Sequence, residues 1–175
     1  MKIKLVLFYF LANMIAGMEI QISIDKQELK VVHDEKIVKT YIISSSSYGE
    51  GSAEGSFKTP LGEHFIKKKI GDGVELGGRF EGRVFYGEIY PIYKKDEVYV
   101  DDDVVQTRIL WLSGLEEGRN KGKGVDSFER YIYIHGTPEE WLLGTKASKG
   151  CIRMANKDVI ELFDIVEENT KVIIK

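Results

Sequence analysis

Residues 148–154 have the sequence Ser-Lys-Gly-Cys-Ile-Arg-Met, and they contain Cys151, the single cysteine of this 175-residue chain. The thiol follows a glycine in a polar stretch. A lone cysteine in such a stretch is more typical of a reactive thiol than of a small buried hydrophobic side chain, which is the alternative. Reaction at a thiol requires a base that removes its proton. The stretch therefore predicts a nucleophile, and the histidines of the chain are the candidates for its base.

His135 is the predicted base. It ends an alternating run of residues and is followed by Gly136 and Thr137. Sixteen positions separate it from Cys151, so the two are not helix neighbours, and a strand end and a returning loop must bring them together. We expect a thiolate–imidazolium pair that attacks a carbonyl carbon. No side chain is an obvious third member: Asp126 is a guess, and we expect a backbone carbonyl to accept from the other ring nitrogen.

The residues that flank Cys151 predict contacts to a substrate. Gly150 permits close approach of the backbone, and the N–H groups of Gly150 and Cys151 are candidates to hold an oxyanion. Arg153 projects to the same side as Cys151 in an extended segment, so we expect its guanidinium to bind a substrate carboxylate, with a structural ion pair as the alternative. Lys149 is a candidate to help ionise the thiol, and a solvated charge is the alternative.

The remaining pattern predicts a mainly β domain. Residues 20–24 alternate apolar and polar side chains, as a half-buried strand does, and two further strands complete an opening β-meander. One helix is predicted near the C-terminus, with Asn156 as its N-cap and apolar side chains at helical spacing after it. In the last strand before this helix, Tyr131, Tyr133 and His135 would share one face. The predicted strands cover residues 20–24, 27–33, 37–43, 63–69, 83–89, 107–112, 130–135 and 172–174.

Two polar segments are predicted to be loops. Residues 44–56 are rich in serine and glycine, and we expect them to be exposed. Residues 113–127 carry four glycines and many charged side chains. We expect this second segment to be a mobile loop that borders the active site as a flap.

The first residues predict a secretory signal peptide. Two lysines precede an apolar run at 5–12, and small residues follow it. We assign residues 1–18 to the signal peptide and 19–175 to one domain, with cleavage one or two residues earlier as an alternative. An uncleaved anchor is a further alternative, but the apolar run is short and is interrupted by Asn13. We therefore expect an exported protein of the periplasm or cell wall, with no stable membrane span after cleavage.

The composition argues against several classes of function. The net charge is −3, and removal of the predicted signal peptide makes it more negative, so the chain lacks the basic character typical of nucleic-acid-binding proteins. His33 and His64 have no second ligand at metal spacing, and we expect no metal site. No glycine motif for phosphate or dinucleotide binding is present, so we expect no cofactor.

The motifs together resemble the L,D-transpeptidase catalytic domain, known as the YkuD family. The resemblance covers essentially all of residues 19–175 and implies a β-sandwich-like fold with one C-terminal helix near the active site. It implies that Cys151 matches the nucleophile and His135 the proton acceptor and donor. The surrounding site motif is matched by Ser148, Gly150 and Arg153, and we add Gly136 and Lys149 as candidate substrate-binding or oxyanion residues. The segments that carry the resemblance are Ile-His-Gly-Thr at 134–137, Gly144, residues 148–154, Asn156, Asp158, Thr-Lys-Val-Ile-Ile at 170–174 and Thr-Pro-Leu-Gly at 59–62.

The resemblance implies an enzyme of peptidoglycan. Such enzymes attack the bond between a diamino acid at the third position of a stem peptide and D-alanine, and they hold the acyl group as a cysteine thioester. An amine of a second stem then takes the acyl group, which makes a 3–3 cross-link. In some members the acceptor is a lipoprotein lysine or water.

Two alternatives stay open beside the L,D-transpeptidase. One is an L,D-carboxypeptidase with the same residues and water as acceptor. The other is a non-catalytic cell-wall-binding domain in which Cys151 is inert. This chain departs from the family pattern at Lys149, where the family often has histidine, and the departure bears on the pKa of the thiol and on substrate contacts.

Overall fold

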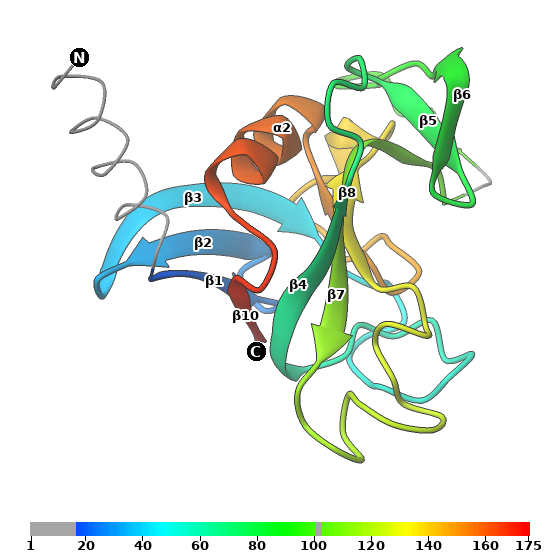
Figure 1. Ribbon diagram of the computed structural model, residues 1–175. Coiled ribbons are helices and arrows are strands. Elements are labelled where there is room, and N and C mark those ends of the chain that lie inside the picture. Colours follow the sequence, from blue (N-terminus) through cyan, green and yellow to red (C-terminus); the bar gives the residue numbers. More distant parts are fainter. Residues whose placement is uncertain (1–16, 101–102) are drawn as a thin grey trace, which may run out of the picture.

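A computed structural model describes residues 17–100 and 103–175, so residues 1–16 of the predicted signal peptide lie outside the described residues. The described chain is mainly β with one C-terminal α-helix, which confirms the predicted fold class (Figure 1). The strands are β1 (Met18–Ser23), β2 (Glu28–His33), β3 (Lys36–Ser44), β4 (Gly62–Ile70), β5 (Gly78–Glu81), β6 (Val84–Ile89), β7 (Val105–Gly114), β8 (Tyr133–Gly136), β9 (Ile152–Met154) and β10 (Lys171–Ile174), and the helical elements are the 3-10 turn η1 (Glu140–Leu142) and α2 (Asn156–Ile165).

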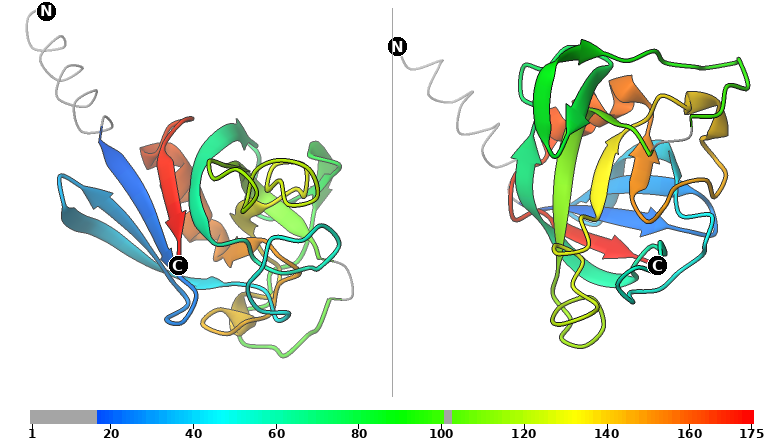
Figure 2. Two further views of the ribbon diagram at one scale, coloured as in Figure 1. Left: turned by 90° about the horizontal axis from the view of Figure 1, so that it is seen from below. Right: turned by 90° about the vertical axis from the view of Figure 1, so that its right-hand side faces the viewer.

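The strands form one sheet that closes on itself. Their order is β4-β10-β1-β2-β3-β9-β8-β7-β5-β6, and β4 also pairs with β7. This extra pairing joins eight strands into a ring and leaves β5 and β6 as a hairpin attached to β7. The hairpin lies on the opposite side of the molecule from strands β1, β2 and β3 (Figures 1 and 2). Two neighbouring pairs are parallel, β1 with β10 and β8 with β9.

Apolar side chains fill the inner face of the ring. The predicted meander is present, and alternation along β1 buries Ile20 and Ile22 completely. Helix α2 adds Val159, Leu162 and Phe163 at helical spacing. Each such side chain stabilises the fold by roughly 1.5–3 kcal/mol on burial. Within residues 17–100 and 103–175, no helix has the length and apolar character needed to span a bilayer.

The prediction that Asn156 caps α2 is wrong. Ala155 occupies the cap position without a side-chain bond, and Asn156 is the first residue of the helix. The Asn156 side chain is buried and hydrogen-bonded instead. Its Nδ2 donates to Thr137 O at 2.8 Å, and its Oδ1 accepts from the Thr107 hydroxyl. Glu140 does the capping instead, because its Oε1 accepts the Asn156 backbone N–H at 2.8 Å.

The predicted strand at 130–135 is shorter in the structure. β8 begins at Tyr133, because Tyr131 has a left-handed φ of 57° and lies in a turn. Tyr131 is therefore outside the strand, and the expectation that it shares a face with Tyr133 and His135 by alternation is wrong. The sequence pattern also misses β5 and β9, which have four and three residues and are too short to show a period.

The serine-rich segment at 44–56 is buried at its start. Ser44–Ser46 are at most 1% exposed, so the expectation of an exposed loop is wrong there. Their polar groups have partners, as buried groups require. The Ser46 hydroxyl donates to Phe57 O, and the Ser46 backbone N–H donates to Thr59 Oγ1 at 3.1 Å.

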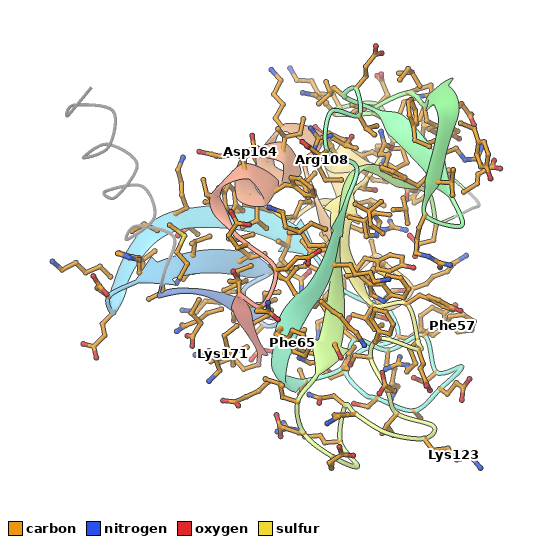
Figure 3. The ribbon with its side chains drawn as sticks, viewed as in Figure 1. Phe57, Phe65, Arg108, Lys123, Asp164 and Lys171 are labelled. Carbon is orange, nitrogen blue, oxygen red and sulfur yellow. The ribbon has the colours of Figure 1, made fainter. Side chains whose placement is uncertain are left out.

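The segment at 113–127 is also tied down. Asn120 is fully buried, and its Nδ2 donates to Leu61 O at 3.0 Å and to Glu63 O at 3.1 Å. These bonds join the segment to the start of β4, so the expected mobile loop is anchored through its middle, while its tip directs Lys123 outward (Figure 3). A flap-like opening of this segment would have to break the Asn120 bonds.

His64 is buried in β4 with a partner for each ring nitrogen. Nδ1 lies 3.0 Å from Gly62 O and Nε2 lies 2.9 Å from Ser127 Oγ. Burial lowers the pKa of His64 from 6.5 to about 4. The imidazole is therefore neutral near pH 7 and serves the packing of the loop onto β4.

We predict that His64→Gln removes part of the acid sensitivity of the fold. The unfolded chain takes up a proton on His64 near pH 6.5 and the folded chain only near pH 4, so stability is lost as the pH falls through this window, by up to about 3 kcal/mol. Urea unfolding at pH 7 and pH 4.5 measures the effect. The wild type should lose about 2 kcal/mol more than the variant between these values. Equal losses in both proteins would contradict a neutral, buried His64.

Candidate active site

The parallel pairing of β8 with β9 brings the two predicted catalytic residues to one face of the sheet. In this register Ile134 lies opposite Ile152, and His135 lies opposite Arg153. Cys151 directly precedes β9, so alternation along the strand turns it to the same face as Arg153 and His135. The two isoleucines point the other way and are fully buried in the core. The sulfur and the imidazole are thus diagonal neighbours on adjacent strands.

The turn before Cys151 is held by three hydrogen bonds. Gly150 has a φ of 124°, a conformation that favours glycine. The Ser148 hydroxyl donates to Cys151 O at 2.6 Å and accepts the Gly150 N–H at 3.3 Å. The Thr59 hydroxyl donates to Gly150 O at 3.0 Å. Ser148 is fully buried and shapes the loop, and Thr59, whose signal in the sequence is the Thr-Pro-Leu-Gly segment, clamps it from a distant part of the chain.

The sulfur of Cys151 lies between two backbone groups of the preceding turn and strand. The Tyr133 N–H donates to Sγ at 3.3 Å, and the thiol points to Tyr131 O at 3.4 Å. The residue is partly exposed, but burial of the sulfur raises the pKa of the thiol to about 12, helped by the negative charge of Asp103. The free cysteine therefore carries its proton near neutral pH.

An aromatic wall borders the sulfur. It consists of Trp111, Phe128, Tyr131 and Tyr133, and Cys151 packs against the same apolar cluster. The Trp111 ring stacks on Phe128 with centroids 4.0 Å apart and meets Tyr133 edge-on at 5.5 Å. Such a wall offers a flat apolar surface beside the thiol.

His135 is completely buried, and its surroundings define which nitrogen is basic. Nδ1 lies 2.8 Å from Gly136 O, and a carbonyl can only accept, so Nδ1 carries the hydrogen. This confirms the expected backbone carbonyl as the orienting group. Nε2 is left with its lone pair and has no partner among the described residues. The guess of Asp126 is wrong, because its carboxylate accepts the backbone N–H groups of its own loop.

The resting pair is neutral rather than charged. Burial lowers the pKa of His135, although Asp103 and the Gly136 carbonyl act in the opposite direction. With the thiol pKa raised to about 12, the proton stays on sulfur. The expected thiolate–imidazolium pair is therefore not the unliganded state.

Gly136 contributes in two ways: its carbonyl accepts a hydrogen bond from His135 Nδ1, and its missing side chain permits close packing. It is buried in β8, and a Cβ there would collide with the Asn156 side-chain oxygen and approach Gln106 O to 2.7 Å. It was predicted to contact substrate or an oxyanion, but the structure places it inside the packing, where it fixes the orientation of His135.

Arg153 forms ion pairs with two carboxylates of its own chain. It is 3% exposed, its Nη1 donates to Glu139 Oε2 at 2.8 Å, and its Nε donates to Asp103 Oδ1 at 3.0 Å. The structural ion pair is thus the arrangement observed, and the guanidinium already holds two carboxylates where it borders the hollow described below. Sequence reasoning missed both partners, because Asp103 and Glu139 meet Arg153 only through the fold.

Lys149 lies at the edge of a hollow of about 330 Å³ at the Arg153 end of the face. Burial alone would raise the pKa of Asp103, but Arg153, His135 and the Lys149 N–H hold it below its usual value. Cys151 does not line the hollow, which therefore lies beside the sulfur rather than over it. The lining residues are Tyr99, Val100, Asp103, Glu139, Leu142, Thr145, Lys146, Ala147, Lys149 and Arg153.

Within the described part of the chain, no three histidine, cysteine or acidic side chains come together as metal ligands. The ring nitrogens of His64 are both engaged, and His135 is occupied by its carbonyl on one side. The arrangement suited to chemistry is thus the thiol of Cys151 with the free Nε2 of His135.

The protein is thus a closed, mainly β domain. Its candidate site is one thiol and one buried imidazole on the same face of the sheet. The chain belongs to the L,D-transpeptidase catalytic domain family, YkuD, whose match covers residues 17–174.

Two curated relatives come from Bacillus subtilis (strain 168). The YkuD protein is 58% identical over 46 residues, which are 26% of this chain and 28% of the relative. The YqjB protein is 44% identical over 52 residues, which are 30% of this chain and 28% of the relative. The alignments thus span little more than a quarter of the length of these relatives.

Solved structures share the fold. An L,D-transpeptidase from Xylanimonas cellulosilytica DSM 15894 has a TM-score of 0.53 at 19% identity, over 91% of this chain and 60% of that one. L,D-transpeptidase 3 from Mycobacterium tuberculosis, in complex with a faropenem-derived adduct, has a TM-score of 0.56 at 16% identity, with 91% and 60% covered. At these identities the likeness establishes the architecture.

We predict that Arg153→Met destabilises the fold by about 3 kcal/mol or more, because it leaves two carboxylates, one of them on the buried Glu139, without their guanidinium. Chemical unfolding measures the loss. The double variant Arg153→Met/Glu139→Gln should recover a large part of it. A loss below about 1 kcal/mol would mean that the pair behaves as an exposed one.

Proposed function

We propose that this chain is a peptidoglycan L,D-transpeptidase in which Cys151 is the nucleophile and His135 the general base. The observation that carries the proposal is the shared face of β8 and β9, which presents the thiol beside an imidazole whose Nε2 has no partner among the described residues. Membership of the family supports the substrate class. The substrate is a peptidoglycan stem tetrapeptide, and no cofactor or metal takes part.

In the proposed acylation, Nε2 of His135 takes the thiol proton as sulfur attacks the carbonyl carbon of the diamino acid–D-alanine bond. The Cys151 N–H is the proposed donor to the oxyanion, since the Gly150 N–H already binds the Ser148 hydroxyl. The imidazolium then returns its proton to the amine of D-alanine, which leaves, and the acyl group remains as a thioester on Cys151.

In the proposed second step, an amine attacks the thioester carbon while His135 takes its proton, and the carbon–sulfur bond then breaks as His135 gives this proton to the sulfur of Cys151. An amine of a second stem gives a 3–3 cross-link, and a lipoprotein lysine gives an attached protein. Water as acceptor would make the enzyme an L,D-carboxypeptidase. Residues 1–18 are the proposed signal peptide and 19–175 the catalytic domain, which places the enzyme in the periplasm or cell wall.

The surroundings of the sulfur favour the neutral thiol before a substrate binds. The Tyr133 N–H and the positive charges of Arg153 and Arg130 favour negative charge on the sulfur, while burial and Asp103 oppose it. A neutral thiol protects an exported cysteine from oxidation until a carbonyl is bound, because the thiolate is the reactive form.

We predict that Cys151→Ala abolishes conversion of a disaccharide tetrapeptide while the fold keeps near wild-type stability, since the sulfur makes only weak bonds to Tyr131 and Tyr133. Mass spectrometry follows tripeptide and cross-linked dimer. Tripeptide without dimer from the wild type would favour the carboxypeptidase. Turnover that survives in the variant would contradict the assignment of Cys151. A wild type that is folded but gains no covalent adduct from a carbapenem would favour the binding domain.

We predict that the acid limb of kcat/KM for wild-type enzyme has its midpoint below pH 6.5, the ordinary value for histidine, because burial lowers the pKa of His135 and the base must be neutral. Activity should rise through this limb and stay level to alkaline pH, because the thiol pKa is about 12. Circular dichroism at each pH verifies that the protein is folded. A rise centred near pH 9 would mean that the thiolate forms without His135.

A further inference from the structure

The guanidinium of Arg83 lies beside the active-site face without a carboxylate partner among the described residues. Arg83 lies at the turn of the β5–β6 hairpin, and its Nη1 donates to the Tyr133 hydroxyl at 3.3 Å. Its guanidinium carbon lies 4.9 Å from the ring centroids of both Trp111 and Tyr131. These contacts hold the charge over the aromatic wall, and no described carboxylate lies within ion-pair distance of it.

Tyr133 connects this guanidinium to the sulfur. Its backbone N–H donates to Sγ of Cys151 at 3.3 Å, and its hydroxyl accepts from Arg83 at 3.3 Å. The positive charge therefore lies one tyrosine side chain from the thiol, along the aromatic wall. A peptide whose carbonyl carbon sits at the sulfur would carry its neighbouring groups across this distance.

The other arginines of the face are occupied. Arg153 is buried between two carboxylates, and Arg130 is half-buried and donates to the backbone oxygens of Gly51 and Lys58 at 3.3 and 2.7 Å. Arg83 differs from Arg153 because it is partly exposed and its described partners are neutral. It differs from Arg130 because its guanidinium lies over the aromatic wall, whereas that of Arg130 donates to backbone oxygens.

The backbone at Arg83 supports a role outside folding. Gly82 and Arg83 have φ values of 54° and 72°, the left-handed pair of a tight hairpin turn. The second of these positions favours glycine or asparagine, and an arginine there costs stability. Residues held in such conformations cluster at active sites and ligand-binding sites.

We propose that Arg83 is the specificity-determining residue that binds a carboxylate next to the scissile bond of the donor peptide. The inference rests on the proposed function for the identity of the donor. Two carboxylates of such a donor fit the chemistry, the C-terminal carboxylate of D-alanine and the side-chain carboxylate of the diamino acid. A fork of N–H donors on an aromatic surface suits either, and amidation of the correct one removes the charge-assisted bond.

The test measures binding of three donor peptides to the Cys151→Ala protein: one with both carboxylates free, one amidated at D-alanine and one amidated at the diamino acid. We expect one amidation to weaken binding about tenfold, as the loss of a charge-assisted hydrogen bond does. Addition of Arg83→Gln should make the three dissociation constants equal. Arg83→Gly should do the same with at least equal stability, because glycine relieves the turn.

Arg79→Gln is the matched control, since Arg79 lies on the same hairpin but is paired with Glu81 and Glu88. It should keep the tenfold preference. A preference that survives in both Arg83 variants, or that is absent from the Cys151→Ala protein, overturns the proposal. Failure of the wild type to convert any of the three donors would count against the proposed transpeptidase function, while the dissociation constants still decide the role of Arg83.

Discussion

The parallel ladder between β8 and β9 places the sulfur of Cys151 and the imidazole of His135 on one face of the sheet. A slip of one residue would turn Ile152 outward and send the thiol into the core. The register is held from both sides. The buried pair of Arg153 with Glu139 fastens β9 to the segment after β8, and the absence of a side chain at Gly136 lets Asn156 of α2 pack against β8.

Burial gives the site its electrostatic character. Burial disfavours the charged form of both the imidazole and the partly exposed thiol. Asp103 would stabilise an imidazolium but opposes a thiolate, and Arg153 acts in the opposite sense on each. In the proposed reaction, the Tyr133 N–H, Arg153 and Arg130 favour negative charge on the sulfur once the substrate is bound. The same buried arginine thus holds β9 in place and acts on the pKa values of both groups.

The sequence predicted what depends on local pattern. The β-meander, the apolar stripe of α2 and the lone cysteine with its histidine all follow from spacing and residue type. The features that it missed depend on contacts between distant segments. The clamp of Thr59 on Gly150 spans much of the chain, and Arg153 has carboxylate partners that no period reveals. Asn156 has the residue type of a helix cap, yet burial against Thr137 and Thr107 outweighs that local preference. β9 is set by its partners rather than by its own residues.

Among the described strands, the β5–β6 hairpin pairs with the closed ring only at the start of β7. Its length, turn and outer strand can therefore change without breaking any pairing that holds the ring or the β8–β9 ladder. Under the proposed role of Arg83, changes in this hairpin alter which peptides bind while the β8–β9 ladder stays the same. The same separation makes the hairpin the natural place to graft a new selectivity onto an existing member of the family.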